Sequence, residues 1–179
     1  MLYNIQQLKR QLQPGDVFLV HGNHLASRII RIVTDSHWNH ATLYIGDGKF
    51  IEANTHGVEI RPISAYHGKQ IEIYRHHKIT EKHRKKIIDH VLQKKGEAYD
   101  FFQIAQLFFY YLFGIRGNAR EIGTTNRYIC SELVAEAYKV SGLEVYKHYN
   151  PTQISPADFC NSPLFRLCVQ GKGTIVLKD

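Results

Sequence analysis

The chain is organised around one segment, Asn126-Arg127-Tyr128-Ile129-Cys130-Ser131-Glu132-Leu133-Val134. From Leu133 to Tyr138, apolar residues recur at i, i+1, i+4 and i+5, and this stripe predicts a helix that ends at Ser141-Gly142. Cys130 therefore falls in the first turn of the predicted helix. Unpaired backbone N–H groups and the positive end of the helix dipole favour a thiolate there, so the segment predicts a reactive cysteine.

A second segment, far upstream, carries an imidazole and a carboxylate. It reads Trp38-Asn39-His40-Ala41-Thr42-Leu43-Tyr44-Ile45-Gly46-Asp47-Gly48-Lys49-Phe50-Ile51-Glu52 and predicts a strand, a glycine turn and a second strand. An imidazole that accepts the proton of a thiol raises the thiolate fraction, and a carboxylate holds that ring in the productive tautomer. We therefore predict Cys130 as a nucleophile, His40 as its base and Glu52 as the group that orients His40. Backbone N–H groups at the start of the helix would bind an oxyanion.

The loop length of this hairpin decides whether the base and the carboxylate can meet. If residues 46–48 form the loop, Ile45 pairs with Lys49, and His40 and Glu52 share one face of the sheet as diagonal neighbours. Their Cβ atoms are then roughly 7–8 Å apart, within reach of both side chains. A two-residue loop would place them on opposite faces.

Size and charge define the class of protein. With 179 residues, 44% hydrophobic and 22% charged, the chain predicts one globular domain, residues 1–179. The formal net charge of +7 favours anionic partners, so we expect an anionic cell-wall polymer or a membrane surface. The basic residues accompany no nucleic-acid motif, and we expect no nucleic-acid partner. Their one cluster, at 82–86, is interpreted as a solvated helix face.

The cysteines bear on the compartment. Cys130, Cys160 and Cys168 are too few for a disulfide scaffold and favour a reducing environment. Cys160 and Cys168 open no helical stripe, so both fit the usual fate of a free cysteine, a small buried hydrophobe. Residues 1–10 lack the apolar core of a signal peptide and predict a short amphipathic helix. We expect a cytoplasmic protein, or one of the cell envelope if a leader has been removed.

The remaining apolar patterns predict an α+β fold. Further strands are expected at 16–20, 58–62, 70–74, 165–169 and 174–177, and helices at 25–33 and 80–95. We expect the early strands to form an antiparallel meander, in a curved sheet of about five or six strands packed on helices. The most apolar run, 101–115, is too short to span a bilayer and predicts a buried core helix, with a lid or lipid-facing helix as the alternative.

Four segments together resemble the circularly permuted branch of the NlpC-type cell-wall peptidase superfamily. They are 40–48, 96–100, 128–134 and 155–158, and their His-before-Cys order is the permuted one. The resemblance implies a papain-like fold in which a helix carrying the nucleophile packs on an antiparallel sheet carrying the base. It matches Cys130 to the nucleophile, His40 to the base and Glu52 to the third polar residue. It thus implies a single permuted papain-like cysteine hydrolase domain that needs no cofactor.

The same resemblance bears on the substrate. It implies cleavage of an amide bond in cell-wall peptides or amino-acid amides. Unpermuted relatives commonly place an Asp before the nucleophile to help bind a free α-amine, whereas this chain has Ile129 there. The branch also includes relatives of lecithin retinol acyltransferase, so a lipid acyltransferase or thioesterase using the same Cys-His pair is the alternative. A catalytically silent binding module is the third hypothesis.

Residues beside the predicted triad are candidates for substrate contacts. Trp38 and Asn39 precede the predicted base, and Tyr128 stands two residues before the predicted nucleophile. These side chains are expected to line the pocket, with simple packing as the alternative for Tyr128. Asp100 is a rival for the role of the orienting carboxylate.

Histidine pairs raise a metal site as a further alternative. Histidines stand three apart at 21 and 24 and at 37 and 40, and those at 76 and 77 are adjacent. None of the pairs has the helical His-Glu-x-x-His pattern of a zinc enzyme. We therefore expect no metal.

Overall fold

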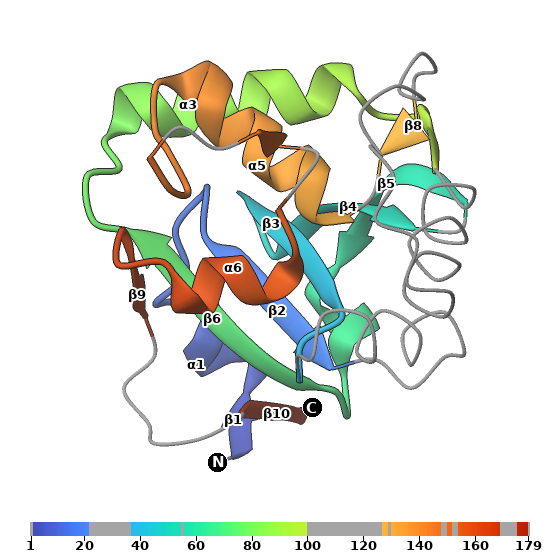
Figure 1. Cartoon of the computed structure of the whole chain (residues 1–179). Helices are drawn as coiled ribbons and strands as arrows, with labels where there is room; N and C mark the ends of the chain where they lie inside the picture. Colours follow the sequence, from blue (N-terminus) through green and yellow to red (C-terminus); the bar gives the residue numbers. More distant parts are fainter. Residues whose placement is uncertain are drawn as a thin grey trace, which may run out of the picture.

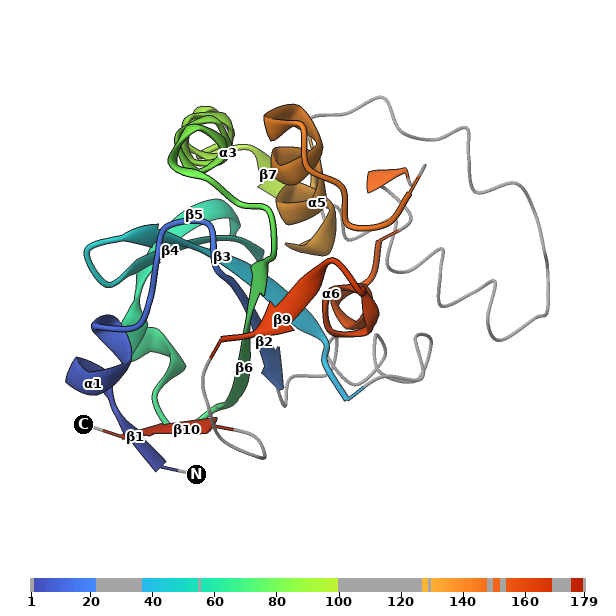
Figure 2. The same cartoon turned by 90° about the vertical axis from the view of Figure 1, so that its left-hand side faces the viewer.

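The computed structural model has the α+β architecture that the sequence predicts (Figure 1). A twisted sheet lies at the centre, and helices α3 (Glu81–Gln93) and α5 (Cys130–Ser141) pack against each other over one of its faces. Figure 2 shows this layering from the side, with α1 (Ile5–Lys9) on the other side of the sheet. The structure describes residues 2–21, 37–54, 56–99, 127–128, 130–147, 150–151, 154–168 and 175–178.

Within the described residues the main sheet has eight strands, in the order β1-β10-β6-β2-β3-β4-β5, with β9 paired to β6. The strands are β1 (Leu2–Asn4), β2 (Val17–His21), β3 (His40–Gly46), β4 (Lys49–Asn54), β5 (Gly57–Pro62), β6 (Gln70–His76), β9 (Phe165–Leu167) and β10 (Ile175–Lys178). Neighbours run antiparallel except β1 and β10, which are parallel. Short elements complete the chain: η1 (Ile63–Tyr66), β7 (Ala98–Tyr99), β8 (Arg127–Tyr128) and α6 (Pro156–Asn161).

The sheet differs from the predicted meander in the position of β6. Strands β3, β4 and β5 do form a meander, but β6 pairs with β2 instead of β5. Strand β2 is buried on both faces, because Val17 and Leu19 enter one core while Phe18 and Val20 enter the other. Its backbone N–H and C=O groups are shielded from water as well, so each edge of β2 needs a neighbouring strand to bond with. The sheet is also wider than expected, because β1 pairs in parallel with β10, the strand predicted at 174–177. The prediction of a helix over residues 1–10 is therefore wrong for Leu2–Asn4 and right for Ile5–Lys9.

Two hydrophobic cores lie on the two faces of the sheet. The first joins Leu19 and Leu43 to Ile87 of α3 and to Leu133 and Tyr138 of α5, all of them fully buried. This confirms the predicted apolar stripe of the helix that begins at Cys130. The second core covers the opposite face and contains Leu8, Phe18, Phe50 and Tyr66.

Several predicted segments, 25–33, 101–115 and the following loop to 126, lie outside the described residues. Among the residues that are described, no helix combines the length and hydropathy needed to cross a membrane.

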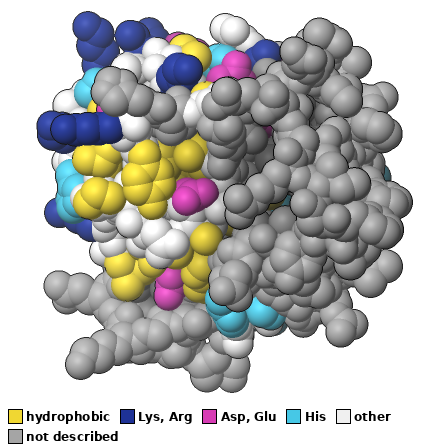
Figure 3. Space-filling model, in the orientation of Figure 1, with side chains coloured by type: hydrophobic (Ala, Val, Ile, Leu, Met, Phe, Trp, Pro, Cys, Tyr) yellow, Lys and Arg dark blue, Asp and Glu magenta, His cyan; other side chains and the backbone are white. Residues whose placement is uncertain are grey.

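The basic run at 82–86 has a mixed environment. Figure 3 shows Lys and Arg side chains along the top of the molecule, where α3 lies, and Lys82, Lys85 and Lys86 are exposed. Arg84, in contrast, is only 6% exposed and donates a hydrogen bond to the carbonyl of Pro14. The prediction of a solvated face is therefore wrong for Arg84, whose side chain belongs to the interior.

Candidate active site

Cys130 is the first residue of α5, as the sequence predicts, and its side chain is buried, with 3% of the residue exposed. Strand β8, paired in parallel with β7, leads the chain to this position. The backbone groups of Ala41 and Ser131 and the ring of His40 form hydrogen bonds with the sulfur. Burial alone would raise the pKa of the thiol, but the charge of His40 and these hydrogen bonds lower it below its ordinary value.

The hairpin that carries His40 and Glu52 has a different turn from the predicted one. Only Asp47 and Gly48 form the turn, both with positive φ (52° and 70°), and Gly46 pairs with Lys49. A two-residue turn alone would place the imidazole and the carboxylate on opposite faces of the sheet. A register shift between Tyr44 and Gly46 compensates, because this β-bulge adds one residue to β3 and returns the strand to the predicted alternation.

His40 and Glu52 consequently meet on one face. The Nε2 atom of His40 lies 2.8 Å from Oε2 of Glu52, and the two side chains are 21% and 8% exposed. Burial lowers the pKa of the His40 ring, but the charges of Glu52 and Cys130 outweigh it and raise the pKa to about 10. Burial likewise raises the pKa of Glu52, yet His40 and the hydrogen bonds to the carboxylate lower it to about 2. Since Nε2 faces Glu52, Nδ1 is the ring nitrogen left for the thiol.

Two further residues hold the carboxylate, and the sequence analysis missed both. The hydroxyl of Tyr66 donates to Oε2 of Glu52, and the side-chain amide of Asn54 donates to Oε1 at 3.0 Å. Asn54 could have been found, because it stands two residues after Glu52 on the same strand and so shares its face. Tyr66 closes a short 3-10 helix beyond β5, and its position carries no sequence signal.

Of the three residues predicted to contact the substrate, the structure describes the side chains of two, and both are buried. Trp38 and Asn39 are 6% and 2% exposed, and Trp38 belongs to the core beside α5. Tyr128 lies in β8, and its side chain is outside the described part of the structure, as is Asp100. A role in substrate binding stays a prediction for all three of the proposed contacts.

The other two cysteines differ electrostatically from Cys130. Burial raises the pKa of Cys160, and burial together with the charge of Asp16 raises the pKa of Cys168 to about 12. The thiol of Cys160 donates to the carbonyl of Ala157 at 3.0 Å. Both thiols are therefore protonated at neutral pH. Both residues are only partly buried, so the prediction of small buried hydrophobes holds only in part.

The described histidine pairs are engaged in other contacts. The Nδ1 atom of His21 lies 2.9 Å from the carbonyl of His37, whose Nε2 lies 3.1 Å from the Gln70 side chain. The Nε2 atom of His76 faces the carbonyl of Glu144 at 3.2 Å. Across the described ranges, no group of three or more His, Cys, Asp or Glu side chains is arranged to hold a metal ion.

Most of the chain matches one known protein family. The family described as permuted papain-like amidase enzyme, YaeF/YiiX, C92 family, matches residues 11–167. The chain belongs to this family. Membership confirms the permuted papain-like fold and the α+β class, and it supports a cysteine hydrolase-like role among amidase enzymes. The C92-family match includes His40, Glu52 and Cys130.

A solved structure shares the fold. It is the crystal structure of the metalloprotein yiiX from Escherichia coli O157:H7, with 17% sequence identity and a TM-score of 0.64. The alignment covers 90% of this chain and 98% of that chain. At this identity the likeness supports the C92 fold and nothing finer. No curated protein matches the sequence.

Proposed function

We propose that this C92-family chain is a cysteine amidase that forms an acyl-enzyme at Cys130, with His40 as base and Glu52 as the orienting carboxylate. The supporting observation is the row of contacts from the sulfur, through the imidazole, to the carboxylate. The lowered pKa of the thiol and the raised pKa of the ring favour a thiolate beside an imidazolium at neutral pH.

The proposed steps follow from this charge state. The Cys130 thiolate attacks the amide carbonyl, and N–H groups at the start of α5 bind the oxyanion that forms. The His40 imidazolium gives its Nδ1 proton to the leaving amine as the C–N bond breaks, which leaves a thioester on Cys130. Neutral His40 then takes a proton from water as the water oxygen attacks the thioester carbonyl. The C–S bond breaks, which releases a carboxylic acid and restores the Cys130 thiolate beside the His40 imidazolium. Glu52 keeps the ring oriented and stabilises its charged form.

The proposed substrates are cell-wall peptides or amino-acid amides. The NlpC-type resemblance motivates this class, and Ile129 before the nucleophile argues against recognition through a free α-amine. The net charge of +7 suits an anionic polymer or membrane surface as the place of action. The yiiX protein is described as a metalloprotein. The described residues here offer no set of three metal ligands, so the proposal routes no step through a metal.

Alkylation with iodoacetamide near neutral pH tests the nucleophile. We expect Cys130 to react at least about tenfold faster than Cys160 or Cys168, because only its pKa is lowered. The substitution His40→Ala removes the group that favours the thiolate and should abolish this preference. Mass spectrometry of digested protein measures the labelling of each cysteine.

A matched control uses another histidine. His77 is exposed and its ring contacts the carbonyl of Pro163, so His77→Ala should leave the labelling pattern unchanged. Equal labelling of the three cysteines in the wild type would overturn the proposal and favour a silent binding module. The lipid acyltransferase or thioesterase alternative depends on residues 101–115, outside the described residues, and it predicts turnover of acyl esters in place of amides.

A further inference from the structure

Tyr66 lies beneath the candidate site. It is the last residue of η1 and is 2% exposed, and its ring packs edge-on against Phe50 with 5.2 Å between ring centroids. The hydroxyl donates to Oε2 of Glu52, which is the same oxygen that contacts His40. A tyrosine from a separate element thus shares one carboxylate oxygen with the predicted base.

The geometry leaves the carboxylate little freedom. Tyr66 and His40 both face Oε2, while Asn54 donates to Oε1 at 3.0 Å. Asn54 is itself anchored, because its amide also donates to Glu59, the residue opposite Glu52 on β5. Three donors therefore approach the two oxygens from different elements, and rotation of the carboxylate would break at least one charge-assisted hydrogen bond.

The hydroxyl is held in its donor form. Burial and the charge of Glu52 raise the pKa of Tyr66 well above its ordinary value, so the phenol keeps its proton at neutral pH. A donor that cannot ionise favours the charged form of the carboxylate it contacts. The charged carboxylate in turn favours the imidazolium and, through it, the Cys130 thiolate.

We propose that Tyr66 is a positioning residue for the reaction at Cys130, which acts by holding Oε2 of Glu52 against His40. The inference rests on the proposed function, because it concerns the same nucleophile. Tyr66 acts through Glu52 and His40 and is not itself a reacting group. A phenylalanine at this position would keep the packing on Phe50 and lose only the contacts of the hydroxyl, the hydrogen bond to Glu52 and a longer one to Thr42 at 3.3 Å.

The test measures the pH profile of Cys130 alkylation in Tyr66→Phe. Without the phenol donor, the pKa of Glu52 rises and its support for the imidazolium weakens, so the profile should move upward by about one pH unit. On the acidic limb of the profile, where only a small fraction of the thiol is ionised, the alkylation rate should fall about tenfold, while the rate at alkaline pH, where the thiol is ionised in both proteins, should be unchanged. A purely structural role would lower the melting temperature and leave the profile in place.

The control removes a similar hydrogen bond elsewhere. Tyr74 on β6 donates to Glu72 at 2.7 Å, so Tyr74→Phe should lose a Tyr–Glu contact without moving the profile. An unchanged profile in Tyr66→Phe, with a wild type that still depends on His40, would overturn the role of Tyr66 alone. A wild type without any preference for Cys130 would overturn the proposed function first.

A second measurement applies if Tyr66→Phe fails to fold. In the wild type, NMR should detect the Tyr66 hydroxyl proton as a slowly exchanging, downfield resonance, because it is buried against a carboxylate. Glu52→Gln replaces that charged acceptor, so the resonance should shift upfield. A resonance that stays in place in Glu52→Gln would show that the hydroxyl does not hold this carboxylate.

Discussion

The three ionisable groups of the site depend on one another. Burial opposes the charged form of each, raising the pKa of Cys130 and Glu52 and lowering that of His40. The mutual charges reverse all three shifts, so thiolate, imidazolium and carboxylate are stable only as a set. Removing one member leaves a buried charge without compensation, which is far more costly than losing an exposed ion pair.

Glu52→Gln should reveal this dependence in the acid stability of the protein. The pKa of Glu52 is lowered from 4.5 to about 2, so its contribution to stability is present above pH 4.5 and is lost as the pH falls toward 2. The shift corresponds to at most roughly 3 kcal/mol. Between these pH values, the wild type should lose that much more unfolding free energy than Glu52→Gln, as measured by urea denaturation at each pH.

An exposed carboxylate provides the comparison for that experiment. The side chain of Glu81 is 92% exposed and pairs with Arg84 at 3.0 Å, so Glu81→Gln should follow the acid curve of the wild type closely. Parallel acid curves for the wild type and Glu52→Gln would mean that the carboxylate is not charged in the folded protein at low pH.

At the scale of elements, the hairpin between β3 and β4 shows what sequence patterns can and cannot supply. The prediction that His40 and Glu52 share a face was right, but the predicted three-residue loop was wrong. Asp47-Gly48 is a signal for a two-residue turn with positive φ, and it was available in the sequence. The bulge that restores the alternation was not, because it lies between Tyr44 and Gly46 at the end of β3, where only Gly46 follows and no alternating side chains remain to show the change of phase.

Two contacts between distant elements could not be predicted from the sequence. The stripe of α5 and the position of Cys130 follow from local periodicity, and both were predicted correctly. The pairing of β6 with β2 and the approach of Tyr66 to Glu52 depend on tertiary packing. Local propensity carries no information about either.

Gly57→Ala tests how β5 is joined to the segment that leads into β7. Gly57 has φ +103°, and an added Cβ would lie 2.5 Å from the backbone oxygen of Glu97, which also accepts a hydrogen bond from Val58. Both the positive φ and the backbone clash oppose the substitution, so unfolding should become easier by about 2–4 kcal/mol. Gly68→Ala is the control, because its Cβ would meet nothing within 4 Å at φ +71°. Urea denaturation should show a loss of only about 1–2 kcal/mol there.

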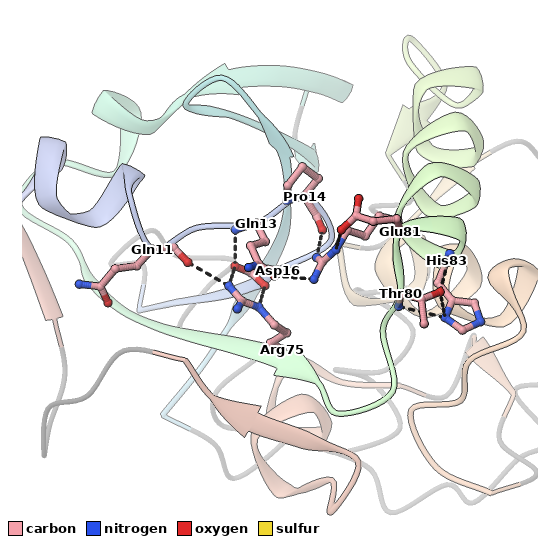
Figure 4. A network of polar contacts seen from close by, with 9 residues as sticks. Gln11, Gln13, Pro14, Asp16, Arg75, Thr80, Glu81 and His83 are labelled. Carbon is pink, nitrogen blue, oxygen red and sulfur yellow. Dashed lines mark hydrogen bonds and ion pairs between the residues drawn. The ribbon is translucent and has the colours of Figure 1, made fainter.

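At the scale of the whole molecule, the turn at residues 14–16, just before β2, is hydrogen-bonded to three separate elements. Figure 4 shows Arg75 of β6 clasping Asp16, with Nε–Oδ1 and Nη2–Oδ2 distances of 2.6 and 2.7 Å. Arg84 of α3 donates to the carbonyl of Pro14, and Tyr138 of α5 donates to that of Gly15 at 2.5 Å. The turn therefore connects the sheet to both helices of the upper layer, including the helix that begins at Cys130.

Arg75→Ala should weaken the whole fold without altering the chemistry of the site. Asp16 is fully buried, so removing its partner leaves an uncompensated charge, and the unfolding free energy should fall by about 3–5 kcal/mol. Arg61→Ala is the control, because the Arg61–Glu59 pair is 40% and 35% exposed and its loss should cost at most about 1 kcal/mol. Urea denaturation measures both losses.

A double variant tests the cause of the stability loss. Asp16→Asn combined with Arg75→Ala removes both charges and should recover part of the lost unfolding free energy, since the loss in Arg75→Ala comes mainly from the unpaired carboxylate. Under native conditions the folded fraction of Arg75→Ala should keep the Cys130 alkylation rate of the wild type, because Asp16 and Arg75 bond to each other and to the backbone at Gln11 and Gln13, apart from the His40–Glu52 pair. A stability loss no larger than that of Arg61→Ala would mean that the clasp around Asp16 does not hold the layers together.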